Sequence, residues 1–347
     1  MKFKNKFNLS NSNLNTKYIN SYKKILFEKY SMQEAHLALY FLKKISLIGF
    51  IFLFQLEFSL SATSTSQMRT PSYGAISGGL AGSGLSSVDP GESYILNPGA
   101  VAHLRGAAVT LGSSNFLSTP QDANSEASSN NGWHFSLNEN SPDSSLASSI
   151  FISKSRSREK SPLTKILNYN DAWLTLGNFI MPQLAAGLSY HFRDTQDPLQ
   201  TYQEHNFGIG FLWTPWESLG IGFSLLNFNT PPKEIPISYT LGSTSGVGLL
   251  YIFKEFLHLR LDYTKKDHQL ESQSYTETAL GLETSLSDWL FSRIGVAQQK
   301  TETNETTLKY SFGLGFLGPR FGVNYAFQQY HQSQKGKEHN LDIIIPF

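Results

Sequence analysis

The chain has 347 residues, with 28 Lys and Arg against 27 Asp and Glu, no cysteine, and only 16% charged residues. The net charge is +1 and we find no basic cluster after the amino-terminal leader, so neither nucleic acid nor anionic lipid is an expected partner. The lack of cysteine excludes disulfides and thiolate metal sites. The mean hydropathy of −0.25 excludes a polytopic helical membrane protein, because each spanning helix needs about 20 mostly apolar residues.

The amino-terminal part, residues 1–62, is predicted to be a leader. Two lysines precede a compact apolar run at residues 45–54, and the segment ends in the small residue Ala62. This order is typical of a secretory signal peptide, whereas the alternative is an uncleaved anchor helix. Residues 1–31 are too long for an ordinary charged region, which leaves Met32 as a second candidate start of translation.

Motifs for enzymes, nucleotides and metals are missing from the sequence. The glycine cluster within residues 63–90 superficially suggests a phosphate loop, but the Gly-Lys-Ser/Thr ending that such a loop needs is absent. The segment Gly242–Gly246 carries Thr244 where a hydrolase has its nucleophilic serine, and the histidines show no pair at helical ligand spacing. We therefore predict no enzyme activity, no cofactor and no metal.

The rest of the chain alternates between apolar and polar or small residues. In the segment Leu308–Phe316, every even position is large and apolar, and the odd positions are Lys, Ser, Gly and Gly. A period of two predicts a strand with one apolar face and one small or polar face. The same pattern recurs from residue 184 onward, and no helical period is convincing after Ala62, so we predict an all-β chain.

The spacing of the turns decides between a soluble sandwich and a membrane barrel. Short turns near 182, 215, 254, 287 and 318 follow one another about 31 to 39 residues apart, which fits two membrane-length strands and one longer polar loop each time. We therefore predict a closed transmembrane antiparallel β-barrel over residues 106–347. It has about fourteen strands, the first at about 106–117, 131–139 and 146–152, with a long loop between about Ser153 and Asn170. Trp213, Trp216 and Trp289 lie at the short turns, where a membrane interface favours such rings.

The carboxyl-terminal residues resemble the signal strand of bacterial outer-membrane barrels. Leu341, Ile343 and Ile345 alternate and Phe347 ends the chain, whereas Asp342 departs from the pattern. The resemblance of Ile345 and Phe347 to this signal implies insertion by the barrel-assembly machinery into the lipid of a bacterial cell outer membrane.

A second motif precedes the barrel. The segment Ser93–Gly106, with Asn97, Pro98 and Gly99 at its centre, resembles the segment that opens the barrel in the FadL/TodX superfamily and in PorV-like relatives, although Gly99 and Ala100 invert the usual order. Proline fixes its own φ and pushes its predecessor out of the helical region, so this pair turns the chain. The resemblance implies a fourteen-stranded barrel with residues 63–105 as a plug in the lumen.

The same resemblance implies passive uptake of hydrophobic small molecules by a monomer. The alternative is a PorV-like barrel that does not transport and serves as a structural, secretion or assembly partner. Apolar residues near the polar loops form either a capture site for such a ligand or loops packed on themselves; they are Phe116, Leu117, Trp133, Leu163, Ile166 and Leu167. Charged residues expected to face the lumen either line a path or hold strands and plug together; they are His258, Arg260, Asp262, Glu277, Glu283, Arg293 and Lys309.

Overall fold

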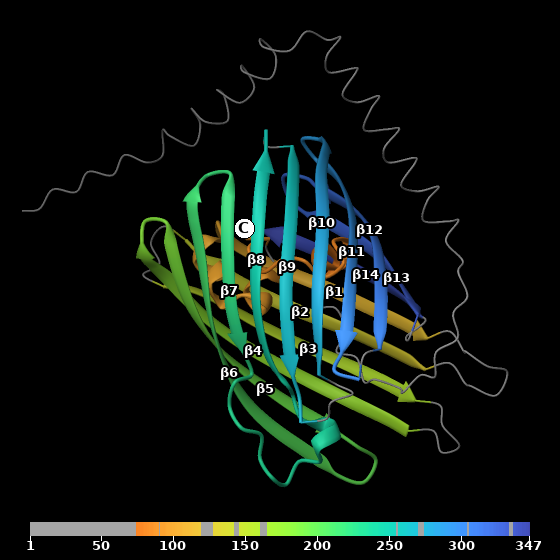
Figure 1. Ribbon diagram of the computed structural model, residues 1–347. Helices are drawn as coiled ribbons and strands as arrows, with labels where there is room; N and C mark the ends of the chain where they lie inside the picture. The colour runs from red at the N-terminus through yellow and green to blue at the C-terminus, as the bar shows by residue number, and fades with distance from the viewer. Residues whose placement is uncertain are drawn as a thin grey trace, which may run out of the picture. The chain divides into compact units, whose positions relative to one another are not determined.

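The computed structural model describes residues 74–89, 91–118, 128–141, 146–159, 165–254, 256–269, 274–303, 305–332 and 336–347. Within them, fourteen strands close into one antiparallel barrel, in which each strand pairs with its sequence neighbours and the last strand pairs with the first (Figure 1). The strands are β1 (Gly106–Ser118), β2 (Ser129–Asn140), β3 (Ala147–Glu159), β4 (Lys165–Met181), β5 (Leu184–Gln196), β6 (Thr201–Trp216), β7 (Leu219–Leu226), β8 (Ser243–Phe253), β9 (Leu257–Asp267), β10 (Tyr275–Ser287), β11 (Leu290–Thr301), β12 (Thr306–Leu317), β13 (Gly322–Gln332) and β14 (Gly336–Pro346). The predicted all-β barrel of about fourteen strands is therefore confirmed.

The predicted loops are less accurate than the strands. The expected long loop between Ser153 and Asn170 is wrong, because β3 runs to Glu159 and β4 begins at Lys165. Both faces of β3 are polar from Ser153 onward, so the apolar period that marks a strand is lost there. β8 begins only at Ser243, and Ile237–Tyr239 before it form a 3-10 helix, η2. Residues 227–242 are thus the longest loop whose residues are all described.

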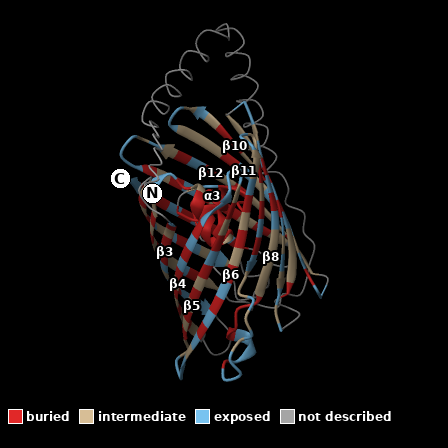
Figure 2. Ribbon diagram, turned by 90° about the vertical axis from the view of Figure 1, so that its left-hand side faces the viewer, coloured by how far each residue is buried: buried red, intermediate tan, exposed pale blue. Residues whose placement is uncertain are grey.

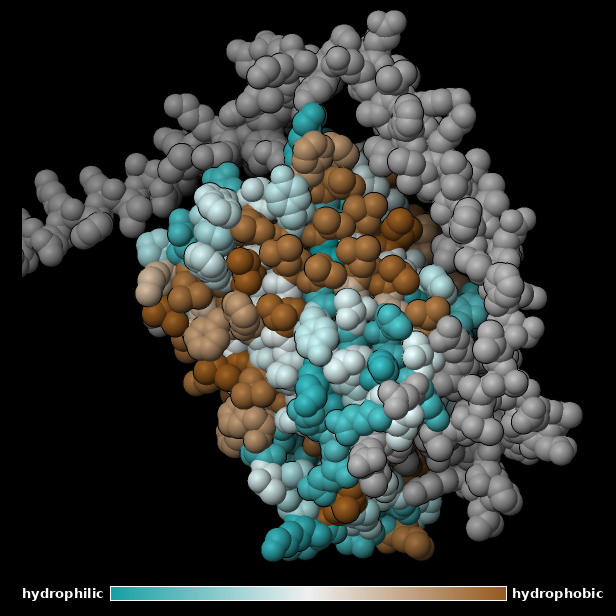
Figure 3. Space-filling view, in the orientation of Figure 1, coloured by the Kyte–Doolittle hydropathy of each residue, from teal (hydrophilic) through white to brown (hydrophobic). Residues whose placement is uncertain are grey.

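The outer face of the barrel is apolar and exposed. In β9, Leu259 and Leu261 are 41% and 44% exposed, whereas Arg260 between them is 2% exposed and points inward. Trp213, Trp216 and Trp289 are exposed and lie beside tight turns, as predicted. Figure 3 shows hydrophobic residues gathered over the part of the barrel face where strands meet at tight turns, with hydrophilic residues below them. In the part of the chain that the structure describes, no helix is long and apolar enough to cross a membrane.

Residues 74–104 form three short helices that contact the inner face of the strands. They are α3 (Ala75–Gly79), α4 (Ser93–Leu96) and the 3-10 helix η1 (Pro98–His103). All five residues of α3 are buried, and Figure 2 shows them within the ring of strands. We call residues 74–104 the inner segment. The predicted leader, residues 1–62, and the first part of the predicted plug, residues 63–73, lie outside the described residues.

The two ends of the barrel differ in the length of their connections. The short-turn end carries the tight connections at 182–183, 217–218 and 288–289, together with the start of β1 and the end of β14. The long-loop end carries residues 227–242. At the short-turn end, the backbone N–H of Phe347 donates to the carbonyl of Ala107 at 3.0 Å, so the carboxyl-terminal residue extends the closing ladder. Leu341, Ile343 and Ile345 point outward, and Asp342 points inward.

Candidate functional site

The inner segment lies directly on wall glycines. Gly177, Gly187 and Gly210 are cross-strand neighbours on the inner face of β4, β5 and β6. A Cβ atom at Gly187 would overlap the backbone of Pro98, and one at Gly210 would overlap the amide oxygen of Asn97. Because glycine has no Cβ, it allows this close backbone approach. Further inward glycines lie under the segment in the same way; they are Gly222, Gly248, Gly281, Gly295 and Gly313.

Asn97 joins the inner segment to the wall. Its Oδ1 accepts a hydrogen bond from the N–H of Gly99 at 3.0 Å, which fixes the turn into η1. Its Nδ2 donates to the carbonyl of Leu85 at 2.7 Å and to the carbonyl of Phe211 in β6 at 2.9 Å. The side chain is fully buried, so these bonds replace water for all three backbone groups. The predicted Asn-Pro turn therefore also serves as a contact with the wall.

The seven predicted lumen charges all lie on inward positions. Glu283 accepts from Arg293 Nε at 2.5 Å, lies 3.0 Å from His258 Nδ1 and lies 3.6 Å from Arg260. The Nζ of Lys309 donates to both carboxylate oxygens of Glu277, each at 3.2 Å. These pairs join β9, β10, β11 and β12 across the inner face of the wall.

Two of these charges hold the inner segment. Arg260 donates to Asp89 at 2.5 Å, and Asp262 accepts from the N–H groups of Gly84 and Leu85 at 2.6 and 2.8 Å. Arg260 and Asp262 are each 2% exposed. Of the two interpretations given above, these contacts support a network that holds strands and segment together, because burying a charge is costly unless it is paired.

Glu92 is a site residue that the sequence did not reveal, because it lies in a polar stretch without periodicity. Its carboxylate accepts from the N–H and, at 2.9 Å, from the hydroxyl of Ser77. Burial, together with the nearby charges of Asp342 and Asp89, raises the pKa of Glu92 to about 8. Asp342 accepts from the N–H of Ala75 at 2.6 Å, so two carboxyl groups meet where α3 begins.

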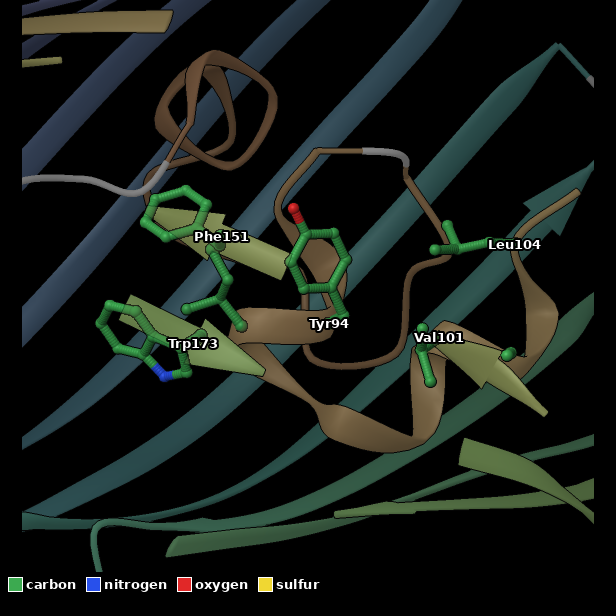
Figure 4. Close-up of a cluster of buried hydrophobic side chains, with 7 residues drawn as sticks. Tyr94, Val101, Leu104, Phe151 and Trp173 are labelled. Carbon is green, nitrogen blue, oxygen red and sulfur yellow. The ribbon is translucent and has the colours of Figure 1, made fainter. Parts of the chain in front are cut away.

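Aromatic side chains form a row along the inner face of neighbouring strands. Trp173 of β4 stacks on His191 of β5 with ring centroids 3.5 Å apart, and it meets Phe151 of β3 edge to face at 5.6 Å. Phe151 in turn stacks on His134 of β2 at 5.3 Å. Figure 4 shows Phe151 and Trp173 beside Tyr94 of the inner segment, with which they form one buried cluster. The sequence signal was available, since these aromatic residues occupy inward positions of adjacent strands.

A second apolar cluster lies toward the long-loop end. It brings together Leu167 and Tyr169 of β4 with Ile235 and Tyr239 of the loop at 227–242. Tyr202 of β6 packs against it, with its ring centroid 5.5 Å from that of Tyr239. The long loop is thus folded against the inner face of β4. We call these five residues the outer cluster.

The residues expected to form a capture site are placed apart. Leu167 belongs to the outer cluster, and its neighbour Ile166 alternates with it along β4. Phe116 points inward and meets Tyr330 edge to face at 5.8 Å. Leu117 and Trp133 are 51% and 50% exposed on the outer face. Leu163 lies outside the described residues.

Comparison with solved structures identifies the fold. The chain is similar to the CymD monoaromatic hydrocarbon channel, with a TM-score of 0.65 and 11% identity over 79% of this chain and 97% of that one. It is also similar to a Pseudomonas aeruginosa FadL homologue, with a TM-score of 0.62 and 13% identity over 81% of this chain and 100% of that one. The Pseudomonas putida toluene transporter TodX is similar with a TM-score of 0.59 and 12% identity over 82% of this chain and 98% of that one. No protein-family model and no curated protein sequence matches the chain. The barrel fold expected from the FadL/TodX resemblance is confirmed.

Proposed function

We propose that this barrel is an outer-membrane channel for passive uptake of small hydrophobic molecules, aromatic ones in particular. The observation that carries the proposal is the pair of apolar features inside the wall. The outer cluster lies toward the long-loop end, and the row of Trp173, Phe151 and His134 continues across the next strands toward Tyr94. Aromatic faces bind aromatic ligands by stacking and edge contacts, so this row would offer successive contacts to such a ligand when the inner segment that buries it moves aside.

The position of the outer cluster supports a capture role. Leu167, Tyr169, Tyr202, Ile235 and Tyr239 come from two strands and one long loop, and pockets that bind small molecules are typically apolar with few polar groups. The cluster has polar contacts at its edge, since the hydroxyl of Tyr239 donates to Asp197 and that of Tyr202 donates to Gln200 at 3.4 Å. A ligand would reach the cluster first and pass inward to Trp173.

The wall itself offers a second feature relevant to transport. The ladder between β6 and β7 ends at the pair Gly208 and Leu226, whereas β6 continues to Thr201. Here the side chain of Asn229 takes the place of a strand, accepting from Phe207 N–H and donating to His205 C=O. The loop at 227–242 therefore completes both the wall and the outer cluster, and movement of this loop would open the barrel at this point.

The proposal is tested by reconstituting the mature barrel in liposomes and measuring uptake of toluene, a labelled fatty acid and a hydrophilic sugar. We expect toluene uptake above protein-free liposomes, and a decrease in the Tyr239→Ser and Trp173→Ala variants. The matched control is Tyr263→Ser, because Tyr263 is 48% exposed on the outer face. Uptake of the sugar alone would indicate a general pore.

The second candidate function is a PorV-like barrel that does not transport and serves as a structural or assembly partner. The observation that favours it is the dense set of wall contacts of the inner segment, including Arg260 with Asp89 and Asn97 with Phe211. Such contacts oppose opening of the lumen. If the folded and inserted barrel takes up none of the three compounds, that result would contradict the transport proposal and favour this function.

A further inference from the structure

Three cations share the outer face of one strand. Lys154, Arg156 and Arg158 occupy alternate positions of β3, so all three side chains point away from the barrel, and all three are exposed. Alternate residues of a strand lie about 6.7 Å apart. No basic cluster, and therefore no anionic lipid partner, was expected here, because serines separate the three residues along the chain. The strand brings them onto one face, which we call the basic stripe.

Among the side chains that the structure describes, the cross-strand neighbours of the basic stripe carry no opposite charge. Its cross-strand partners are neutral; they are Ser129, Asn131 and Trp133 on β2, and Ile166, Asn168 and Asn170 on β4. The inward residues of the same stretch are the serines at 153, 155 and 157. Two strands away, Asp194 Oδ2 accepts hydrogen bonds from Asn170 at 3.0 Å and from Gln196 at 2.9 Å. Among the described residues, no ion pair involves the three cations.

The stripe lies where the apolar outer face ends. Ile150 and Ile152, which precede it on the same face of β3, are 44% and 43% exposed. Trp133 is the cross-strand partner of Lys154 and is also exposed, and a tryptophan beside a cation is typical of the boundary between hydrocarbon and headgroups. Arg156 and Arg158 follow toward the long-loop end. Outer-membrane barrels have short periplasmic turns and longer extracellular loops, so in the outer-membrane placement proposed above this boundary is that of the outer leaflet.

We infer that the basic stripe binds the phosphorylated headgroup of an anionic glycolipid in the outer leaflet. Arginine forms bidentate hydrogen bonds with phosphate, and a row of three cations matches a headgroup that carries more than one phosphate. The exposed isoleucines below the stripe provide an apolar surface for the acyl chains. The inference rests on the proposed membrane placement and does not require transport.

The test uses the full mature barrel in nanodiscs of neutral phosphatidylcholine, with and without diphosphorylated lipid A. Bound lipid A is measured by native mass spectrometry. We expect the Lys154→Gln, Arg156→Gln, Arg158→Gln triple variant to bind lipid A at least about tenfold more weakly than the wild type, with the wild-type binding falling as salt rises. The matched control removes the exposed lysines 265, 300 and 337 on β9, β11 and β14, and it should bind like the wild type.

The outcomes distinguish binding of lipid A by the basic stripe from a general charge effect and from a simple anion site. Equal loss in the triple variant and in its control would overturn the inference, since it would show only a general effect of net charge. Displacement of lipid A by millimolar inorganic phosphate would also overturn it, because a simple anion site would then be sufficient. Failure of the folded barrel to enter any nanodisc would contradict the membrane placement, whereas insertion without preference for lipid A would contradict the stripe alone.

Discussion

Gly210 lies beneath Asn97, and the two residues leave no room for a methyl group between the wall and the inner segment. In the same strand, β6, the carbonyl of Phe211 accepts a hydrogen bond from Asn97 Nδ2. Close packing and a hydrogen bond therefore act at one point of β6. The wall strand and the segment are fitted to each other here, although 114 residues separate Asn97 from Phe211 in the chain.

The Gly210→Ala substitution is expected to displace the inner segment. Its new Cβ would overlap the amide oxygen of Asn97, and overpacking of this kind costs about 1–3 kcal/mol. We call the inner segment seated when it lies against the wall as described and released when it has left the wall. Because the chain has no cysteine, a Ser86→Cys reporter gives a single labelling site, which is buried when the segment is seated. We expect a water-soluble maleimide to label this cysteine about tenfold faster when Gly210 is replaced.

A control for this change is Gly132→Ala in β2. The nearest atoms to its new Cβ belong to Ser155, Ser114 and the backbone of Lys154, all in adjacent strands. The labelling rate of the Ser86→Cys reporter should therefore stay the same. If both alanine variants accelerated labelling equally, the contact between Gly210 and Asn97 would not be the cause.

Asn97 is predicted to stabilise the seated segment through its two donated hydrogen bonds. The Asn97→Ala change leaves the carbonyls of Leu85 and Phe211 without this donor, and a buried polar group that loses its partner costs about 1–3 kcal/mol. The Asn97→Asp change should be worse, because it places carboxylate oxygens opposite those carbonyls. Labelling of the Ser86→Cys reporter should be slowest in the wild type, faster in Asn97→Ala and fastest in Asn97→Asp. A slower rate for aspartate than for alanine would contradict this account.

The sequence predicts the barrel well because a lipid-facing strand must alternate. The inward position of Arg260 and the outward position of Leu259 both follow from that single period. The tip of β3 escaped the prediction because Lys154 and Ser153 are both polar, so no apolar period separates one face from the other. Alternation of apolar and polar residues reveals a strand only where its two faces have different surroundings. It gives no signal where both faces are polar.

Most of the interior could not be predicted from the sequence. The small residue at Gly210 is consistent with an inward face, but only the structure shows that the backbone of the inner segment lies on it. Likewise, the charge of Asp342 acts on Glu92 across 250 residues of chain, and no local pattern encodes such a pairing. The motif around Asn97 was found because its proline has a local conformational effect, which is visible in sequence.

Arg260 is expected to be necessary for seating of the segment. It is 2% exposed and pairs with Asp89 of the segment at 2.5 Å, and removing one partner of a buried pair costs about 3–5 kcal/mol. The Arg260→Met variant should label rapidly at the Ser86→Cys reporter and should unfold at a lower temperature in detergent. Adding Asp89→Asn should restore part of the protection, since it removes the unpaired carboxylate; no recovery would mean that Arg260 acts only through Glu283.

Seating of the inner segment is also expected to depend on pH through Glu92. Its pKa is raised to about 8 by burial and by the charges of Asp342 and Asp89, whereas the released segment would have the ordinary value of 4.5. The seated state therefore holds a proton that the released state loses, so the stabilisation is fully present below pH 4.5 and is lost as the pH rises toward 8. The slope is at most about 1.4 kcal/mol per pH unit for one proton. Labelling of the Ser86→Cys reporter should accelerate over this range in the wild type.

The Glu92→Gln variant removes this titration while keeping an acceptor for the N–H of Ser77. Its labelling rate, corrected for ionisation of the reporter thiol in an unfolded control peptide, should stay constant between pH 4.5 and 8. The exposed Glu302→Gln change should leave the wild-type pH profile as it is, because that carboxyl group lies in a loop away from the segment. A profile that persists in Glu92→Gln would assign the pH dependence to another group, and a flat wild-type profile would show that the seated Glu92 loses its proton as readily as the released one.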